Sequence, residues 1–295
     1  MKGPATQPRY ALVTAAFNEE AYLERLIRSV IAQTVRPLKW IIVSDASTDR
    51  TDEIVTAFAR EYDFIQLYRM TEEHARNFAA QVNSINRGFE LLRELDYEFV
   101  GNLDADISLD PAYFGRLIEE FERQPLLGLA GGFIYEDAGV GFAPRPTNSE
   151  RSVPHAVQLF RRGCFEELGG YVPLPYGGPD WHAEVSARMK GWQVEAFPHL
   201  PVYHHRPTGT AGGLLRYWYR QGAMDYALGS HPLFELVKLG RRLRSRPYVL
   251  GAVARLAGFL RATVCRDPRP VSEEFVRFLQ NEQKERLRCM VPGSM

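Results

Sequence analysis

The N-terminal third of the chain alternates between short apolar runs and longer segments whose apolar residues recur at helical spacing. The predicted strands are Tyr10–Phe17, Trp40–Ser44, Phe64–Tyr68 and the run that starts at Phe99. The first predicted helix starts at about Leu23, the second is centred near Ile54, and the third spans about Phe78–Leu95. An order of strand, helix, strand predicts right-handed βαβ units. The sequence therefore predicts an α/β fold with a parallel sheet.

The fourth apolar run leads into two carboxylates two residues apart, Asp104 and Asp106. Residues two apart in a strand share a face, so both can point at one object if the extended geometry persists. Carboxylate oxygens are the ligands that Mg²⁺ and Mn²⁺ prefer. The alternative is that Asp104 belongs to a turn and Asp106 is solvated.

Other polar side chains follow the predicted strands at the points where those strands end. Asn18 and Glu19 follow the first strand, and Asp45 follows the second. The carboxyl ends of parallel strands meet at one edge of a sheet, where α/β proteins bind ligands. We expect these side chains at the same edge as Asp104 and Asp106.

Five short motifs, in this order, resemble those of the family-2 glycosyltransferases, which have a GT-A fold. They are Thr14–Glu20, Val43–Asp49, Leu103–Asp106, Gly177–Trp181 and Val202–Arg206. The resemblance covers about Tyr10 to Gly209. It implies a mainly parallel sheet flanked by helices, a nucleotide-sugar donor, a divalent metal and inversion at the anomeric carbon.

The resemblance implies a Mn²⁺ or Mg²⁺ site in which Asp106 is a direct ligand. Asp104 would contact the ribose or a metal-bound water. A third ligand would come from the two consecutive histidines, and the resemblance favours His204 over His205. If that segment is extended, the two imidazoles face opposite ways and only one can reach the metal. The alternative is that both histidines merely belong to a proline-bounded loop.

The resemblance also implies a nucleotide-sugar site at the ends of the first two strands. Its expected members are Ala15, Phe17, Glu19, Asp45 and Arg76, together with Asp104. Asp45 would accept from the base, backbone groups near Ala15 and Phe17 would line its other side, and Arg76 would contact the diphosphate. Members of the family usually carry two acids and a glycine where this chain has Ser44-Asp45-Ala46. Asp45 and Asp49 could instead be turn or cap residues.

Asp180 is the expected general base for the acceptor hydroxyl. It follows Gly177-Gly178-Pro179 and precedes a predicted helix over Trp181–Lys190. The family usually has a Glu-Asp pair here, and the second acid is the one that resemblance assigns as the base. The alternative role of Asp180 is an ordinary N-cap. Glu184, one helical turn further on, is the second candidate base.

The C-terminal part of the chain differs from the rest in charge. Residues 236–270 hold nine basic residues against one acid, a net charge of +8 in a chain whose total is zero, so the remainder is −8. The basic residues are Lys238, Arg241, Arg242, Arg244, Arg246, Arg255, Arg261, Arg266 and Arg269. We predict a GT-A catalytic domain over 1–210 and a helical region over 211–295.

The helical region has two candidate roles. Pro232–Leu243 has a basic amphipathic pattern, and Tyr248–Cys265 is apolar but interrupted by Arg255 and Arg261, which makes it too charged to span a bilayer. These segments either lie in the interface of an anionic membrane or pack on the catalytic domain. The three cysteines are widely spaced and form no zinc or redox pattern, which favours a protein of the reducing cytoplasm. If the protein contacts a membrane, we expect it at the cytoplasmic face.

The sequence and the resemblance together predict a metal-dependent, inverting glycosyltransferase. Its acceptor would be a growing cell-surface glycan, free or linked to a lipid carrier, and no nucleic acid partner is expected. The alternatives are a polyprenyl-phosphate glycosyltransferase and a nucleotide-sugar-binding protein without turnover. A nicotinamide dehydrogenase is disfavoured because no G-x-G-x-x-G follows the first strand.

Overall fold

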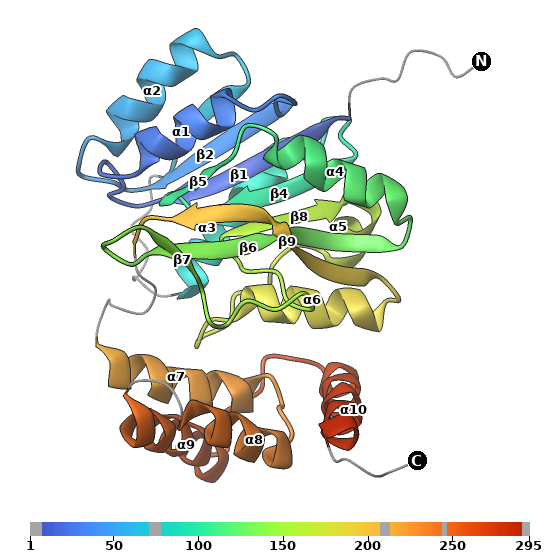
Figure 1. Ribbon diagram of the computed structural model, residues 1–295. Coiled ribbons are helices and arrows are strands. Elements are labelled where there is room, and N and C mark those ends of the chain that lie inside the picture. Colours follow the sequence, from blue (N-terminus) through green and yellow to red (C-terminus); the bar gives the residue numbers. More distant parts are fainter. Residues whose placement is uncertain (1–7, 71–77, 207–212, 244–246, 291–295) are drawn as a thin grey trace. The chain divides into compact units, whose positions relative to one another are not determined.

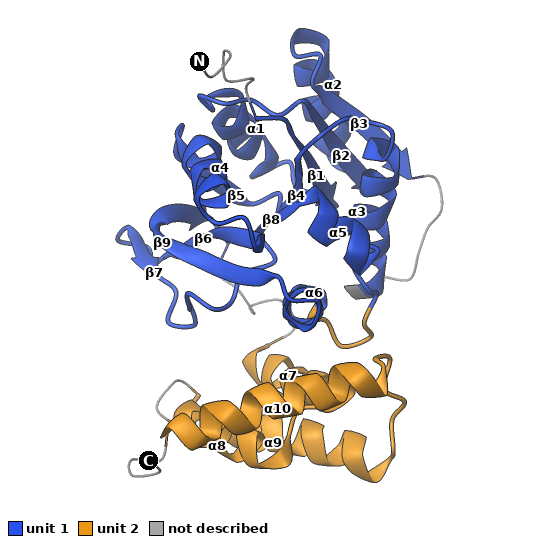
Figure 2. Ribbon diagram, turned by 90° about the vertical axis from the view of Figure 1, so that its right-hand side faces the viewer, with its two compact units in different colours: residues 1–173, 179–207 blue, residues 174–178, 208–295 orange. Residues whose placement is uncertain are grey.

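A computed structural model describes residues 8–70, 78–206, 213–243 and 247–290 of this chain (Figure 1). The chain forms two compact units (Figure 2). Unit 1 comprises residues 1–173 and 179–207, and unit 2 comprises residues 174–178 and 208–295.

Unit 1 is built on a mixed sheet in the order β3-β2-β1-β4-β8-β6-β9-β5, with β7 paired to β6. The strands are β1 Tyr10–Ala16, β2 Lys39–Asp45, β3 Ile65–Met70, β4 Phe99–Leu103, β5 Ile107–Leu109, β6 Leu127–Asp137, β7 Phe142–Pro144, β8 Val157–Arg161 and β9 Gln193–His204. The first four strands pair in parallel, as predicted. The later strands add antiparallel pairs, because β8 runs against β4 and β6, and β5 runs against β9.

Helices cover both faces of this sheet (Figure 1). They are α1 Leu23–Ile31, α2 Thr51–Glu61, α3 Phe78–Leu92, α4 Tyr113–Arg123, α5 Arg162–Leu168 and α6 Pro179–Met189. Along β1, Tyr10 and Leu12 join the core formed with α1, α2 and α4, whereas Ala11 and Val13 join the core formed with α3, α5 and α6. This alternation follows from the two-residue period of a strand.

Unit 2 is helical. Its helices are α7 Leu214–Ala227, α8 Pro232–Arg242, α9 Tyr248–Val264 and α10 Glu273–Met290. The backbones of α7 and α9 approach closely through glycines: a Cβ at Gly222 would lie 1.9 Å from the Arg255 carbonyl oxygen. Among the described residues, no helix combines the length and the apolarity needed to cross a membrane.

Several basic residues of unit 2 face inward, which the sequence pattern did not show. Lys238 lies 2.8 Å from both Asp225 and Glu235, and these two acids also pair with Arg255. Arg242 is buried, with its guanidinium 3.9 Å from the Trp218 ring centroid. The basic surface of this unit is therefore smaller than the charge count suggests. Arg244 and Arg246 lie outside the described residues.

Candidate active site

The two carboxylates after β4 come together through a turn. Strand β4 ends at Leu103, and Asp104 and Asp106 lie in the short connection to β5, where Ala105 and Asp106 form a turn. The extended geometry does not persist through the acid pair, so strand alternation does not explain its convergence. Asp104, Asp106 and His204 nevertheless converge, because three ligand atoms, one from each residue, lie within 4.8 Å of one another.

His204 reaches this cluster because β9 runs antiparallel to β5, with His204 opposite Ile107. Its Nε2 lies 3.3 Å from Oδ1 of Asp106. His205 has its own partners, since its ring nitrogens lie 2.8 Å from the Ser108 hydroxyl and 2.7 Å from the Arg25 guanidinium. Of the two candidate histidines, His204 is thus the one beside the acid pair.

Arg206 connects two carboxylates at this edge, and no role was predicted for it. Its Nε donates to Asp106 at 2.8 Å, and its Nη2 donates to Glu19 at 2.6 Å. Glu19 is therefore engaged by a guanidinium beside the acid pair. The only sequence signal for Arg206 is its place at the end of the Val202–Arg206 motif.

The charges of the cluster shift the pKa values of its members. Burial raises the pKa of Asp106, but the hydrogen bond and charge of His204 and the charge of Arg206 outweigh burial and lower it. Burial lowers the pKa of His204, yet Asp106 outweighs this effect and raises it. For Glu19, burial prevails over Arg206 and the pKa is raised.

His155 is a second residue at this edge that sequence reasoning missed. Strand β8 pairs antiparallel with β4, and this pairing brings the residues before β8 next to the acid pair. The Nδ1 of His155 lies 3.2 Å from Oδ1 of Asp104, while its buried Nε2 has no hydrogen-bond partner in the part of the chain that the structure describes. Burial lowers the pKa of His155, but Asp104 and Asp180 outweigh it and raise it. The signal that could have found it is the short segment that follows, Val157–Phe160, in which three of four residues are apolar.

The residues expected to bind the nucleotide lie at the carboxyl ends of β1 and β2. Ala15 and Phe17 are half-buried at the end of β1, and Asp45 is half-buried as the last residue of β2. The next residue, Ala46, has a φ of 54°, the left-handed region that favours glycine. This explains why a glycine suits that position. Arg76 lies outside the described residues.

Asp49 has a structural role in the turn before α2. Its carboxylate accepts from the backbone N–H of Thr51 at 3.0 Å and from that of Glu20 at 3.0 Å. Burial raises the pKa of Asp49, but these hydrogen bonds outweigh burial and lower it. Asp49 thus ties the turn after β1 to the turn after β2.

Asp180 and Glu184 differ in their surroundings. Helix α6 begins at Pro179, so Asp180 lies in its first turn, half-buried and close enough to raise the pKa of His155. Glu184 is buried and accepts from the Ser152 hydroxyl at 3.0 Å and from the Val153 N–H at 2.8 Å. Burial, together with the charge of Asp180, raises the pKa of Glu184 to about 8.

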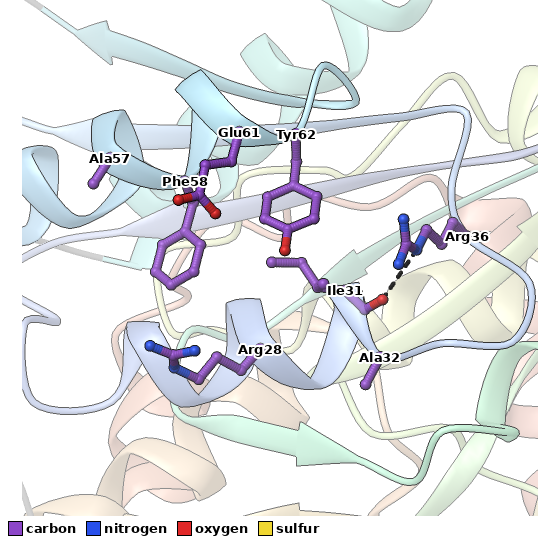
Figure 3. Close-up of a pocket in the computed structure, with 8 residues that line it drawn as sticks. All are labelled: Arg28, Ile31, Ala32, Arg36, Ala57, Phe58, Glu61 and Tyr62. Atoms are coloured by element: carbon purple, nitrogen blue, oxygen red, sulfur yellow. Dashed lines mark hydrogen bonds between the residues drawn. The ribbon is translucent and has the colours of Figure 1, made fainter.

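A pocket of about 520 Å³ lies elsewhere in unit 1, between α1 and α2 (Figure 3). Arg28 and Arg36 approach it beside the Phe58 and Tyr62 rings. Its lining comes from the last turns of both helices, and in a βαβ unit these turns lie toward the amino ends of the strands. None of its lining residues belongs to the acidic cluster.

Curated relatives match a part of the chain. A poly-beta-1,6-N-acetyl-D-glucosamine synthase of Staphylococcus epidermidis is 28% identical over 122 residues, which are 41% of this chain and 27% of that protein. The enzyme of the same name from Staphylococcus aureus strain COL is 29% identical over 118 residues, 40% of this chain and 26% of that protein. The chain thus matches only about a quarter of the length of these relatives.

Solved structures share the fold. The mannosyltransferase PcManGT from Pyrobaculum calidifontis, in complex with GDP-Man and Mn²⁺, has a TM-score of 0.58 and 18% identity, with 98% of this chain and 82% of that chain covered. Residues 1–349 of Staphylococcus aureus TarS, in complex with UDP-GlcNAc, have a TM-score of 0.55 and 13% identity, with coverages of 94% and 83%. The family model described as glycosyl transferase family 2 matches residues 11–173, more than half of the chain, and the chain therefore belongs to glycosyl transferase family 2.

Proposed function

We propose that this chain transfers a sugar from a nucleotide-sugar donor to a glycan acceptor, with inversion and with Mn²⁺ or Mg²⁺ as the cofactor. The observation that carries this proposal is the convergence of Asp104, Asp106 and His204 at the strand edge where α/β proteins bind ligands. The proposed catalytic domain spans residues 1–210, and residues 211–295 form the helical region.

The residues at this edge fit a divalent cation. Two carboxylates and an imidazole supply the oxygen and nitrogen donors that Mn²⁺ accepts. Among the described residues, the ion pairs of the carboxylates Asp104, Asp106 and Glu19 with Lys or Arg are with Arg206, so these four side chains carry a formal charge of −2. In the proposed site Asp106 and His204 would hold the ion, which would supply positive charge beside the departing diphosphate.

The proposed donor site extends from the acid pair toward β1 and β2. Asp104 contacts the ribose or a metal-bound water, and Asp45 accepts from the base. Backbone groups near Ala15 and Phe17 line the other side of the base. The positions of these residues at the carboxyl ends of β1 and β2 support this assignment. Glu19 acts in it through Arg206, and Arg76 remains assigned to the diphosphate.

Asp180 is the proposed general base that accepts the proton of the acceptor hydroxyl. Its place in the first turn of α6, within electrostatic reach of His155, supports this role. Glu184 is less suited because its carboxyl group is buried and already accepts from Ser152 and Val153. Burial raises the pKa of Glu184 to about 8, so this carboxyl group keeps its proton at neutral pH. A protonated carboxyl group cannot act as a general base.

The proposed acceptor is a cell-surface glycan, either free or linked to a lipid carrier at the cytoplasmic face of a membrane. The names of the staphylococcal relatives, which make a polymer of N-acetyl-D-glucosamine, support a growing glycan. The three cysteines are free thiols, two of them exposed, which suits a reducing compartment.

The test measures the release of nucleotide from UDP-GlcNAc and from GDP-mannose by the Asp106→Asn variant and by the wild type. We expect this variant to lose metal-dependent turnover and to keep its fold, because the change removes a charge and little volume. Asp96→Asn is the matched control, since that carboxylate is 78% exposed and its ion pair with Arg9 lies outside the acid cluster. Full activity of Asp106→Asn, or of the wild type in excess chelator, would overturn the metal assignment. Nucleotide binding without turnover on any acceptor would favour a binding protein.

A further inference from the structure

The outward face of α9 carries a continuous row of exposed apolar side chains in unit 2. We call this row the α9 stripe, and it consists of Val249, Leu250, Val253, Leu256, Leu260 and Val264. Their exposed fractions range from 36% at Leu256 to 80% at Val264. Contiguous exposed apolar surface of this kind marks an interaction site in a folded protein.

The helical geometry places the whole stripe on one face. At 3.6 residues per turn, these positions fall within an arc of about 120° along a helix of roughly 25 Å. Arg255, which interrupts the apolar run in the sequence, lies on the opposite face. It pairs there with Asp225 and Glu235 inside the unit. Folding therefore removes this charge from the stripe and leaves an uninterrupted apolar surface.

The charged residues within and directly beside α9 are basic, apart from Asp267, which is paired with Arg261. Helix α9 contains no acidic residue. Arg241 at the end of α8 is exposed, and Arg266 and Arg269 are exposed just after α9. Arg261 at the edge of the stripe is paired with Asp267. An apolar face followed by exposed basic residues, here Arg266 and Arg269, is typical of a helix that lies in the interface of an anionic membrane.

We propose that the α9 stripe is a docking surface for an anionic lipid bilayer, with α9 lying in the plane of the interface. In this arrangement the apolar side chains enter the acyl boundary, and Arg266 and Arg269 face the lipid phosphates. The inference rests on the proposed function in one respect, the lipid-linked acceptor, and it names the surface that would bring the protein to such an acceptor.

Charge argues for lipid over a second copy of the chain. Two copies that met through the stripe would bring their basic flanks together without any acidic residue of α9 to compensate. An anionic bilayer matches both the apolar face and the positive flanks.

The experiment is flotation of the full chain with vesicles of phosphatidylcholine containing phosphatidylglycerol, and with vesicles of phosphatidylcholine alone. We expect binding to the anionic vesicles. This binding should weaken between about 0.1 M and about 1 M salt, because the Debye length becomes shorter. The double variant Val253→Glu, Leu260→Glu should bind at least about tenfold more weakly, because two carboxylates enter the apolar face. The double variant Leu38→Glu, Leu126→Glu is the matched control, because it adds the same two charges to unit 1. Leu126 is 58% exposed against 57% for Val253, and Leu38 is 44% exposed against 49% for Leu260.

Val253 and Leu260 are both exposed, so we expect the double variant to fold, and thermal denaturation followed by circular dichroism verifies this. Nucleotide release with a soluble acceptor should not change in the double variant, so failure of docking is distinguishable from failure of the proposed chemistry. Absence of flotation, or equal flotation of the wild type and the double variant, overturns the proposal. A wild-type dimer that the double variant converts to a monomer also overturns it, in favour of a second copy.

Discussion

A single guanidinium holds two of the carboxylates at the candidate site. The planar fork of Arg206 donates to Asp106 through one nitrogen and to Glu19 through another. A lysine at this position would supply one point charge and could not reproduce this bridge. Arg206 therefore orients the proposed metal ligand as well as balancing its charge.

The first residue-scale prediction concerns Asp180. If this carboxylate is the general base, Asp180→Asn should lower the rate of transfer by roughly 10²–10⁴ with donor affinity nearly unchanged. If it only interacts with the dipole of α6, the change should cost about 0.3–1 kcal/mol of stability and leave the rate intact. Transfer kinetics and urea denaturation of the same variant distinguish these roles.

Asp52→Asn is the matched control for this experiment. Asp52 is the second residue of α2, as Asp180 is the second residue of α6, so both carboxylates occupy the same position in a first turn. The control also loses an ion pair with Arg69. It should lower stability without changing the rate, and an equal rate loss in both variants would argue against a catalytic Asp180.

The second residue-scale prediction concerns the pH dependence of stability. Burial raises the pKa of Glu184 from 4.5 to about 8, so the folded protein keeps a proton that the unfolded chain releases above pH 4.5. The stability that this proton contributes is fully present below about pH 4.5 and is lost as the pH rises to about 8. Glu184→Gln cannot titrate and still offers an acceptor to Ser152 and Val153.

We therefore expect Glu184→Gln to gain stability relative to the wild type as the pH rises. Urea denaturation of both proteins at about pH 5 and about pH 8 measures this difference. A stability difference that is the same at both pH values would show that the carboxyl group does not titrate in this range.

At the scale of elements, antiparallel pairs complete a site that parallel strands begin. Strands β1, β2 and β4 bring Glu19, Asp45 and the acid pair to one edge, and the local periodicity of the chain predicted these strands. His155 arrives through the pairing of β8 with β4, and His204 through the pairing of β9 with β5. These pairings join segments far apart in the sequence, and periodicity within either segment does not identify its partner.

The element-scale prediction concerns the contact of α7 with α9. A Cβ at Gly258 would lie 1.9 Å from the carbonyl oxygen of Tyr219, so Gly258→Ala must push the two helices apart. Overpacking of this kind costs about 1–3 kcal/mol. Gly240→Ala in α8 is the control, because a Cβ there meets no side chain of the described residues within 4 Å.

The control should be stabilised by about 0.5–1 kcal/mol, since alanine is the better helix former. Thermal denaturation followed by circular dichroism measures both changes. Equal stability of Gly258→Ala and the wild type would show that the close approach of α7 and α9 is not required.

At the scale of the whole molecule, ligand binding should be visible as stability. A donor that binds the folded chain at a concentration of 100 times its dissociation constant adds about 2.7 kcal/mol. We expect one class among UDP-, GDP- and dTDP-sugars to raise the melting temperature by several degrees, with a larger rise when Mn²⁺ is present. A thermal-shift panel with and without the metal measures this effect.

Asp45→Ala separates the nucleotide from the metal in that panel. Asp45 ends β2, whereas the acid pair follows β4, so the variant should lose the nucleotide-dependent rise and keep any rise due to Mn²⁺ alone. If the preferred nucleotide stabilises the variant and the wild type equally, Asp45 does not bind the base.

The sequence by itself determined the order of strands and helices in the first half of the chain, because apolar periodicity is a local property. It also identified Asp104, Asp106 and His204 as a candidate set, through the resemblance of short motifs. Only the tertiary structure decided that a turn joins the acid pair, that Arg206 and His155 complete its surroundings, and that Arg255 faces inward. These outcomes depend on contacts between distant segments, where the burial and charge of a side chain are set by partners that its own neighbourhood in the sequence does not specify.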